Sequence, residues 1–406
     1  MEKGYLSQYF DGIAAKKLSA VEVNPGVSNQ HEFNGVRTLR DIYGAPDGKM
    51  RIVTRFLYLN DNDDPVIDDG FLTWYDAREN HPSRTEWRLY YPSNNVSRCM
   101  SVDDTLFICK RKDTTALVIV TQAGSTVENQ LIWLFDFPNT DSLVFTIKQE
   151  TELKQKQMFF ASRQILDVIG VEVQDYAHDY LEEMINRFNC AFPKTRDFSE
   201  YARMTVNTVS AVESPDEALL EWIDREELLF RTMEKHLIAR RLELGFITDG
   251  GVDVGAFIAF SLSVQNRRKS RVGQALENHI EAIFVANNIK YTRTPITENN
   301  SKPDFIFPDI EFYMDRSFPV ARLSMLGVKS TCKDRWRQVL DEADRIENKH
   351  LLTLEAAISK NQMDAMKDRK LQLVVPARIH GSYSLEQQAW LYKLADFIRF
   401  IKNRQY

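Results

Sequence analysis

The first 165 residues contain a series of short apolar runs. Each run is rich in β-branched and aromatic side chains, and Asn, Asp, Gly and Pro separate it from the next, as in strands joined by turns. The runs span residues 51–59, 87–91, 105–110, 116–120 and 131–135. This pattern predicts an all-β barrel or sandwich, which we expect as one domain over residues 1–165.

The pattern becomes helical after about residue 152. Residues 152–190 are helix-prone and rich in charge, and we expect 166–190 to connect two domains. Residues 219–244 show helical periodicity, and so do residues 275–287. In the latter segment the apolar positions share one helix face: Leu276, Ile280, Ile283 and Phe284.

Strands and helices alternate in the rest of the chain. Two strand-like segments, 305–307 and 324–329, precede an amphipathic helix at 336–346 and another strand at 372–376. This order favours a small mixed sheet flanked by helices. We therefore expect a second, α/β domain over residues 191–406.

Composition and charge narrow the class of protein. The chain has 406 residues, room for two and possibly three domains, with 43% hydrophobic and 27% charged residues. No apolar run is long enough to cross a bilayer and no basic-apolar leader is present, so we expect a cytoplasmic protein without a membrane partner. The net charge of −6 argues against indiscriminate coating of nucleic acid but permits site-specific binding. The four cysteines lack metal-ligand spacing and are expected to be free thiols.

A carboxylate and a lysine mark the ends of two neighbouring apolar runs. Asp304 follows Pro303 at the start of the first run, and Lys329 ends the second. Phosphodiester hydrolysis needs hard cations with oxygen ligands, and an ammonium group stabilises charge on the phosphate. The pair therefore predicts a Mg²⁺-dependent nuclease site, with Asp304 as a metal ligand and Lys329 as a catalytic cation.

The usual nuclease pattern fails at one position. It places an acid two residues before the lysine, where this chain has Gly327. Glu342, expected on the helix at 336–346, and Glu277, on the helix before Asp304, flank apolar stripes and are the substitutes we favour as catalytic acids and metal ligands. Alone, each would be read as a solvated helix carboxylate.

Two charged segments are candidate DNA contacts. Lys333-Asp334-Arg335 follows Lys329 closely, and its cations suit guanine O6 and N7 while its carboxylate suits cytosine N4. Residues 265–271 form a basic cluster. Four of its side chains are candidate backbone contacts: Arg267, Arg268, Lys269 and Arg271. The alternative for both segments is a solvated helix start.

These motifs together resemble the EcoRII family of type II restriction endonucleases. The segments that carry the resemblance are 266–271, 296–298, 302–305, 318–320 and 328–338. The resemblance implies the PD-(D/E)XK restriction-endonuclease fold in the C-terminal domain. It also implies, more loosely, an N-terminal effector domain that is a DNA-binding pseudobarrel.

The resemblance also implies roles for individual residues. Glu277, Asp304, Lys329 and Glu342 match the metal and catalytic positions, and Tyr313 matches a tyrosine of the active-site region. The triplet Lys333, Asp334 and Arg335 matches the guanine and cytosine contacts. An acid displaced onto a helix is a feature of this group, which accounts for Gly327.

Two further sets of residues complete the expected DNA interface. Family members stack flipped bases on an arginine and a tyrosine, which here are Ile223 and Glu227, so Trp222 and Arg225 are the candidate substitutes. In the N-terminal half, residues 75–88 interleave basic and polar side chains between two strands. The candidate contacts of this arm are Arg78, Asn80, His81, Arg84 and Arg88. A polar surface hairpin is the alternative.

We therefore expect a homodimeric, Mg²⁺-dependent type II restriction endonuclease. It would make double-strand breaks in DNA at a G·C-rich CC/GG-type site, in defence against foreign DNA, with a cognate DNA methyltransferase encoded alongside. One alternative is a methylation-dependent or mismatch-directed nuclease with the same core. Another is a DNA-binding regulator with an inactive nuclease fold, against which the intact Asp304, Lys329 and Glu342 speak.

Overall fold

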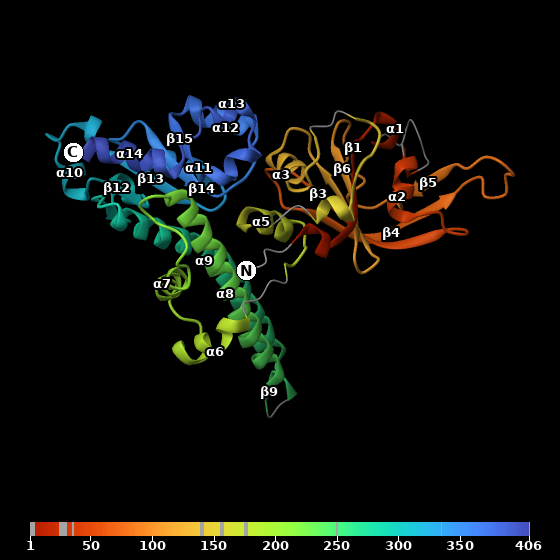
Figure 1. The fold of residues 1–406 in the computed structure, drawn as a ribbon, viewed down its shortest axis with the longest axis horizontal. Coiled ribbons are helices and arrows are strands. Elements are labelled where there is room, and N and C mark those ends of the chain that lie inside the picture. Colours follow the sequence, from red (N-terminus) through yellow and green to blue (C-terminus); the bar gives the residue numbers. More distant parts are fainter. Residues whose placement is uncertain are drawn as a thin grey trace. The chain divides into compact units, whose positions relative to one another are not determined.

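The protein divides into two compact units (Figure 1). The computed structural model describes residues 5–23, 31–34, 36–138, 142–154, 158–173, 178–248, 251–333 and 335–405. The N-terminal unit comprises Met1–Val173 with Ala357–Lys360, and the C-terminal unit comprises Gln174–Ala356 with Asn361–Tyr406.

One eight-stranded sheet forms the centre of the N-terminal unit. Its strands are β1 (Phe10–Lys17), β2 (Glu32–Phe33), β3 (Met50–Leu59), β4 (Val66–Asp76), β5 (Trp87–Tyr90), β6 (Thr105–Arg111), β7 (Ala116–Thr121) and β8 (Thr146–Gln149). They lie in the order β2-β5-β4-β3-β7-β6-β1-β8. Strands β3 and β7 pair in parallel, and the other neighbours pair antiparallel.

Both faces of this sheet are covered. Along β6, Leu106 and Ile108 belong to one hydrophobic cluster, while Phe107 and Cys109 belong to the other. Side chains of successive strand residues point to opposite faces, so a strand buried on both faces reads as a continuous apolar run. This is why β6 and β7 are visible in the sequence.

Among the described residues of this unit, helices accompany the sheet, and they correct the all-β expectation. They are α1 (Ala20–Val23), α2 (Arg40–Tyr43), α3 (Thr126–Leu134), α4 (Glu150–Leu153) and α5 (Phe160–Val168). The four strands expected at 51–59, 87–91, 105–110 and 116–120 are confirmed, but the strand expected at 131–135 is wrong. That segment belongs to α3, which begins where the Ser125 side chain accepts a hydrogen bond from the backbone N–H of Glu128. The Ser-x-x-Glu spacing signals a helix start.

A five-stranded mixed sheet forms part of the C-terminal unit. Its strands are β11 (Thr292–Arg293), β12 (Phe305–Phe307), β13 (Ser324–Lys329), β14 (Lys349–Thr353) and β15 (Leu371–Val374), in that order across the sheet. The first three pair antiparallel, and β13, β14 and β15 pair in parallel. The mixed sheet with flanking helices agrees with the sequence expectation, including the strands at 305–307, 324–329 and 372–376.

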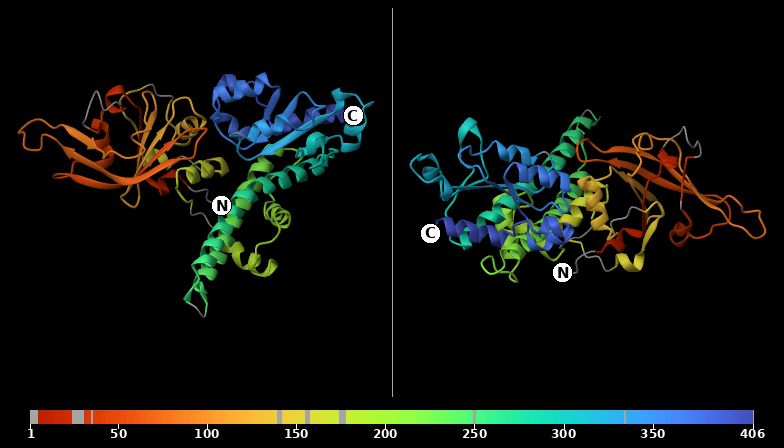
Figure 2. Two further views of the ribbon diagram at one scale, coloured as in Figure 1. Left: turned by 180° about the vertical axis from the view of Figure 1, so that it is seen from behind. Right: turned by 90° about the horizontal axis from the view of Figure 1, so that it is seen from above.

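Helices and one small hairpin complete the C-terminal unit. The helices are α6 (His178–Arg187), α7 (Thr195–Met204), α8 (Pro215–Glu243), α9 (Val254–Ala286), α10 (Ile310–Met314), α11 (Arg335–Leu340), α12 (Lys360–Asp368), α13 (Leu385–Gln388) and α14 (Leu394–Gln405). The long helices α8 and α9 run side by side in every view (Figures 1 and 2). The two-residue strands β9 (Ile247–Thr248) and β10 (Gly251–Val252) join them.

Two expected helices differ in length from those observed. The helix expected at 275–287 is the last part of α9, and its four apolar face residues are fully buried as expected. The helix expected at 336–346 ends at Leu340, whose carbonyl accepts a hydrogen bond from the Lys349 side chain. Ala343 and Ile346 are nevertheless buried.

The segment expected as a connector contributes to both cores. Ile169 and Val171 pack in the N-terminal unit, whereas Met184 packs in the C-terminal unit. All four cysteines are free, as expected. In the part of the chain that the structure describes, no helix is long and apolar enough to cross a membrane.

Candidate active site

Asp304 and Lys329 meet at the ends of neighbouring strands. Asp304 directly precedes β12, which pairs antiparallel with β13, and Lys329 is the last residue of β13. One carboxylate oxygen of Asp304, Oδ2, accepts hydrogen bonds from Lys329 Nζ at 2.8 Å and from the Val328 N–H at 2.6 Å. The carboxylate is thus held in place by rigid backbone, and the expectation that the two groups end adjacent strands is confirmed.

Gly327 is required by the packing of helix α11. A Cβ atom at this position would lie 2.8 Å from Cγ2 and 3.0 Å from Cγ1 of Val339, which belongs to α11. Real Cβ atoms do not approach other carbons so closely, so a side chain at position 327 would require the Val339 side chain to shift. This explains physically why the usual acid is missing from the strand.

Glu342 lies after α11 rather than on it, which corrects the expected helical position. Its carboxyl group is half-buried, and burial raises its pKa to about 7, with Asp304 adding to the rise and Lys329 opposing it. Its Oε2 atom is buried and accepts no hydrogen bond from the described residues. The charges of Asp304 and Lys329 therefore act on the Glu342 carboxyl group, and its Oε2 atom remains open to a ligand.

Glu277 approaches the same pair from helix α9. Burial raises its pKa, and the negative charge of Asp304 raises it further. Arg293, on β11, donates to Glu277 Oε2 at 3.0 Å and opposes that shift, as does the more distant Lys329. The shared influence of Asp304 and Lys329 on Glu277 and Glu342 shows that these four predicted residues gather in one part of the C-terminal unit.

The chemistry of this cluster fits a divalent cation. Carboxylate oxygens are the ligands that Mg²⁺ prefers, and the orphaned Glu342 Oε2 has an open acceptor for one. Among the described residues, no three acidic, histidine or cysteine side chains already converge on a single point. In this conformation Asp304 Oδ2 is instead neutralised by Lys329.

Sequence reasoning missed two basic residues of the cluster. Arg293 holds Glu277, and Lys349, at the start of β14, lowers the pKa of Glu342 through its charge. Lys349 is 7% exposed, and burial lowers its own pKa. Neither residue stands in a motif, because each is brought to the site by strand pairing.

Tyr313 is fixed beside, not within, the four-residue cluster. Its hydroxyl donates to Glu298 Oε2 at 2.5 Å and accepts from the Arg345 N–H at 3.3 Å. The side chain is buried, and desolvation raises its pKa. These contacts give Tyr313 a structural role in positioning the segment that follows Glu342.

The charged triplet lies at the start of α11. Lys333 and Arg335 are exposed, while Asp334 lies outside the described residues. The backbone of this turn is held by hydrogen bonds from Arg335 N to Cys332 O and from Gln362 Nε2 to Lys333 O. The side chains of Lys333 and Arg335 are therefore accessible to a ligand, and hydrogen bonds hold their backbone in place.

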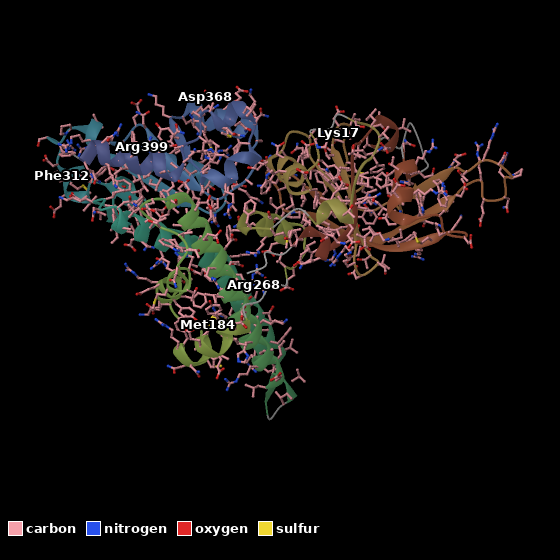
Figure 3. All side chains as sticks on the ribbon, viewed as in Figure 1. Lys17, Met184, Arg268, Phe312, Asp368 and Arg399 are labelled. Carbon is pink, nitrogen blue, oxygen red and sulfur yellow. The ribbon has the colours of Figure 1, made fainter. Side chains whose placement is uncertain are left out.

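The basic cluster on α9 divides into accessible and buried residues. Lys269 is exposed, whereas Arg267 lies over the Phe192 ring at 4.1 Å and Arg268 donates to Glu234 at 2.7 Å (Figure 3 labels Arg268). Arg271 is 6% exposed and forms ion pairs with Glu226 and Glu227. Its charge is already neutralised by these acids in the core, so in this conformation Arg271 is not open to a DNA backbone.

The proposed base-stacking side chains are also engaged. Trp222 is 8% exposed, with its ring centroid 5.8 Å from that of His279, so in this conformation its ring is not open to a base. Arg225 is half-buried over the Tyr180 ring at 5.2 Å. Glu227 stands where the resemblance implies a tyrosine and instead pairs with Arg231 and Arg271.

The N-terminal arm is a loop between β4 and β5. Asn80, His81 and Arg84 are exposed. Arg78 pairs with Glu86 at 2.5 Å, and Arg88 pairs with Glu86 at 2.7 Å and with Glu32 at 3.1 Å. These acids partly neutralise the arm, so its exposed, basic tip lies around Arg84.

Comparison with known proteins shows what this region is similar to. Residues 230–398 match the family model described as EcoRII C terminal. This range contains the Asp304–Lys329 pair, Glu277 and Glu342.

The type II restriction enzyme EcoRII of Escherichia coli is 39% identical to this chain over 236 residues, which is 58% of this chain and 56% of that protein. The resemblance to EcoRII is thereby confirmed over this part, while the chain spans just over half the length of that relative.

The chain was also matched to solved structures. The restriction endonuclease PspGI–substrate DNA complex has a TM-score of 0.44 and 17% identity, covering 52% of this chain and 93% of that one. Metal-depleted Ecl18kI in complex with uncleaved DNA has a TM-score of 0.44 and 15% identity, covering 56% and 83%.

Proposed function

We propose that this protein is a type II restriction endonuclease that makes double-strand breaks in DNA by Mg²⁺-dependent hydrolysis. The observation that carries the proposal is the Asp304–Lys329 pair, 2.8 Å apart, with Glu277 and Glu342 under its electrostatic influence. The 39% identity to EcoRII supports the same activity.

Each residue of the cluster has a proposed task. Asp304, Glu277 and Glu342 would hold the cation, which when bound polarises the scissile phosphate. Lys329 offers an ammonium group to the negative charge that develops on the phosphate. Glu342, whose pKa is about 7, holds its proton at lower pH and binds a cation only after losing it.

Specificity is proposed to come from the turn before α11. Lys333, Asp334 and Arg335 would read guanine and cytosine at a CC/GG-type site, and Lys269 with Arg267 and Arg268 would contact the backbone. Cutting both strands of such a site requires two active sites, so we propose a homodimer. The N-terminal unit, through Arg84 and its neighbours, would bind DNA separately.

The biological setting follows from this activity. A nuclease that cuts short G·C-rich sites would also cut the DNA of its own host, so we propose a cognate methyltransferase as partner and defence against foreign DNA as the role.

A cleavage assay on plasmid DNA with Mg²⁺ tests the activity. We expect Lys329→Ala and Glu342→Ala to reduce the cleavage rate by about 100-fold or more, since each removes charge stabilisation or a ligand. Lys290→Ala and Glu347→Ala are the matched controls, because both residues are exposed and lie outside the cluster. A chelator should stop the wild-type protein.

The ends of the fragments should be sequenced as well. A single recognition sequence at all ends supports restriction activity, while wild-type cleavage by Lys329→Ala would overturn the site assignment. Binding of DNA without cleavage under any divalent cation would favour a regulator with an inactive nuclease fold.

A further inference from the structure

The C-terminal unit contains a cavity of about 380 Å³ beside helix α14. Residues of β14, α12, β15 and α14 line it, together with the segment between α13 and α14. Three of the lining side chains are aromatic rings and three are cations: Trp390, Tyr392, Phe400, Lys367, Lys370 and Arg404. Small-molecule sites commonly range from about 300 to 1,000 Å³, so the cavity has room for a small ligand.

The cavity and the catalytic cluster lie on opposite faces of the five-stranded sheet. Side chains of successive strand residues point to opposite faces. On β14, the Lys349 side chain reaches the end of α11, whereas the His350 ring, in the cavity wall, lies 4.8 Å from the Phe400 ring of α14. On β13, Lys329 shares a face with Gly327, which packs against α11. The cavity is therefore a separate site.

Rings and cations alternate around the cavity. The Lys367 ammonium group lies 5.1 Å from the centroid of the Trp390 ring, and the Arg404 guanidinium group lies 4.1 Å from that of the Phe400 ring. Arg404 also donates a hydrogen bond to the Ser324 hydroxyl at 3.0 Å, which fixes its position. Proteins hold nucleotides with this combination, because the rings stack on bases and the cations attract phosphate.

The positive charges of the cavity are only weakly neutralised. Among the described residues, no acidic side chain lines the cavity. Lys370 pairs with Glu347, and Lys367 lies 3.6 Å from Asp364, but the side chains of these two acids are 72% and 46% exposed. Ion pairs in contact with water contribute little, so both ammonium groups remain available to an anion.

Fixed polar groups lie between the rings. His350 is 4% exposed, and its Nδ1 atom is buried without a hydrogen-bond partner among the described residues. A buried polar atom without a partner costs free energy, which a ligand that bonds to it recovers. The Gln372 amide group is held in place because its Nε2 atom donates to the Trp390 carbonyl at 2.7 Å. The cavity thus offers hydrogen-bonding groups to the edge of a planar ligand.

We propose that this cavity binds a nucleotide, with its aromatic base among the rings and its phosphate at Lys367 and Lys370. An anion without a ring would leave the aromatic walls unused, and an aromatic ligand without a phosphate would leave the ammonium groups unpaired. A free nucleotide and a nucleotide of a DNA strand share this chemistry. The site lies apart from the catalytic cluster, so the proposal does not depend on cleavage.

Isothermal titration calorimetry of the full chain, with a chelator present, tests the proposal. The probes are the four deoxynucleoside 5′-monophosphates, their nucleosides, and inorganic phosphate. We expect at least one monophosphate to bind at least 10-fold more tightly than its nucleoside and than phosphate. Lys367→Ala/Lys370→Ala should weaken this binding by about 10-fold or more. Both lysine side chains are partly exposed, so the variant should fold.

Lys393→Ala/Arg399→Ala is the matched control, because it removes the same charge from exposed positions that do not line the cavity (Figure 3 labels Arg399). It should bind the monophosphate as the wild-type protein does. Circular dichroism checks the fold of both variants, and Lys367→Gln/Lys370→Gln replaces the alanine variant if that is unfolded.

A 5′-phosphorylated single-stranded oligonucleotide separates the two sources of the ligand. If a strand occupies the cavity, its affinity should fall by about 10-fold or more in the lysine variant and remain unchanged in the control, even where no free monophosphate binds. Three results would overturn the proposal: no binding of either probe, equal affinities in the lysine variant and the control, or inorganic phosphate binding as tightly as every monophosphate.

Discussion

At the scale of single residues, two glycines of the C-terminal unit have opposite surroundings. A Cβ atom on Gly327 would meet Val339 at 2.8 Å, whereas one on Gly273, inside α9, would meet no atom within 4 Å. Neither glycine has a positive φ, so the space around each decides the effect of a side chain. The missing side chain at Gly327 allows α11 to pack closely against β13, whereas no neighbouring atom requires a missing side chain at Gly273.

Exchanging each glycine for alanine should therefore have opposite effects on stability. We expect Gly327→Ala to lower the free energy of unfolding by about 1–3 kcal/mol through overpacking. Gly273→Ala should raise it by roughly 0.5–1 kcal/mol, because alanine loses less backbone entropy in a helix. Urea denaturation of both variants measures this, and equal effects would contradict the structural reason.

His350 should make the C-terminal unit sensitive to acid. Burial, and secondly the charge of Arg404, lowers the pKa of His350 to about 4, while the unfolded chain keeps the ordinary value near 6.5. The unfolded state then binds the proton first, so this contribution to stability is complete above pH 6.5 and is lost as the pH falls towards 4. The loss amounts to roughly 3 kcal/mol.

The variant His350→Phe isolates this effect. It keeps a ring among Phe397, Phe400 and Tyr392 but cannot be protonated. Denaturation at pH 7.5 and at about pH 4.5 should show a smaller difference in the variant than in the wild-type protein. An identical pH dependence in both proteins would show that His350 is not buried as a neutral group.

At the scale of elements, buried charges hold α7, α8 and α9 together. Glu226 on α8 lies 2.9 Å from His279 Nε2 and 3.4 Å from Arg271, both on α9. Arg203 on α7 lies 3.2 Å from His279 Nδ1. An arginine donates only, so Nδ1 accepts and the proton of the neutral ring lies on Nε2, towards Glu226. Burial lowers the pKa of His279, consistent with a neutral ring.

Arg271 and Lys269, two residues apart on α9, should respond differently to alanine. Arg271→Ala leaves Glu226 and Glu227 without their shared cation in the core, so we expect a loss of about 3–5 kcal/mol in the free energy of unfolding. Lys269→Ala should leave stability unchanged but lower DNA affinity and reduce its salt slope by about one. Thermal melts and binding at several salt concentrations distinguish the two, and the reverse assignment would refute the burial of Arg271.

At the scale of the whole molecule, the two units have separate hydrophobic cores. The eight-stranded sheet packs its own clusters, and one cluster of the C-terminal unit gathers side chains from α6, α7 and α8. All four residues of the candidate catalytic cluster lie in the C-terminal unit. Cleavage should therefore not depend on residues of the N-terminal half.

Deletion of residues 1–173 should leave specific cleavage in place. We expect the shortened protein to cut plasmid DNA at the same sequence but with a changed dependence on the number of sites per molecule, because the unit that we propose to bind DNA separately is gone. Plasmids with one site and with several sites provide the comparison. A shortened protein that is folded and binds DNA but cuts neither plasmid would show that the N-terminal unit is part of the catalytic machinery.

The sequence by itself determined the features that depend on local pattern. The strands β3, β6, β7, β12 and β13 were predictable because their apolar runs are long or lie between clear turn signals. The Asp304–Lys329 pair was predictable because each residue stands at the end of such a run.

Tertiary structure decided everything that depends on which elements meet. Glu342 lies beyond the expected helix, because α11 ends at Leu340, whose carbonyl accepts a hydrogen bond from the Lys349 side chain at the start of β14. Arg271 is buried because it pairs with two glutamates of α8. Its basic neighbours in the sequence suggest instead an exposed basic surface. Periodicity reports burial along one element, whereas the partner of each face is fixed by contacts between elements that are far apart in sequence.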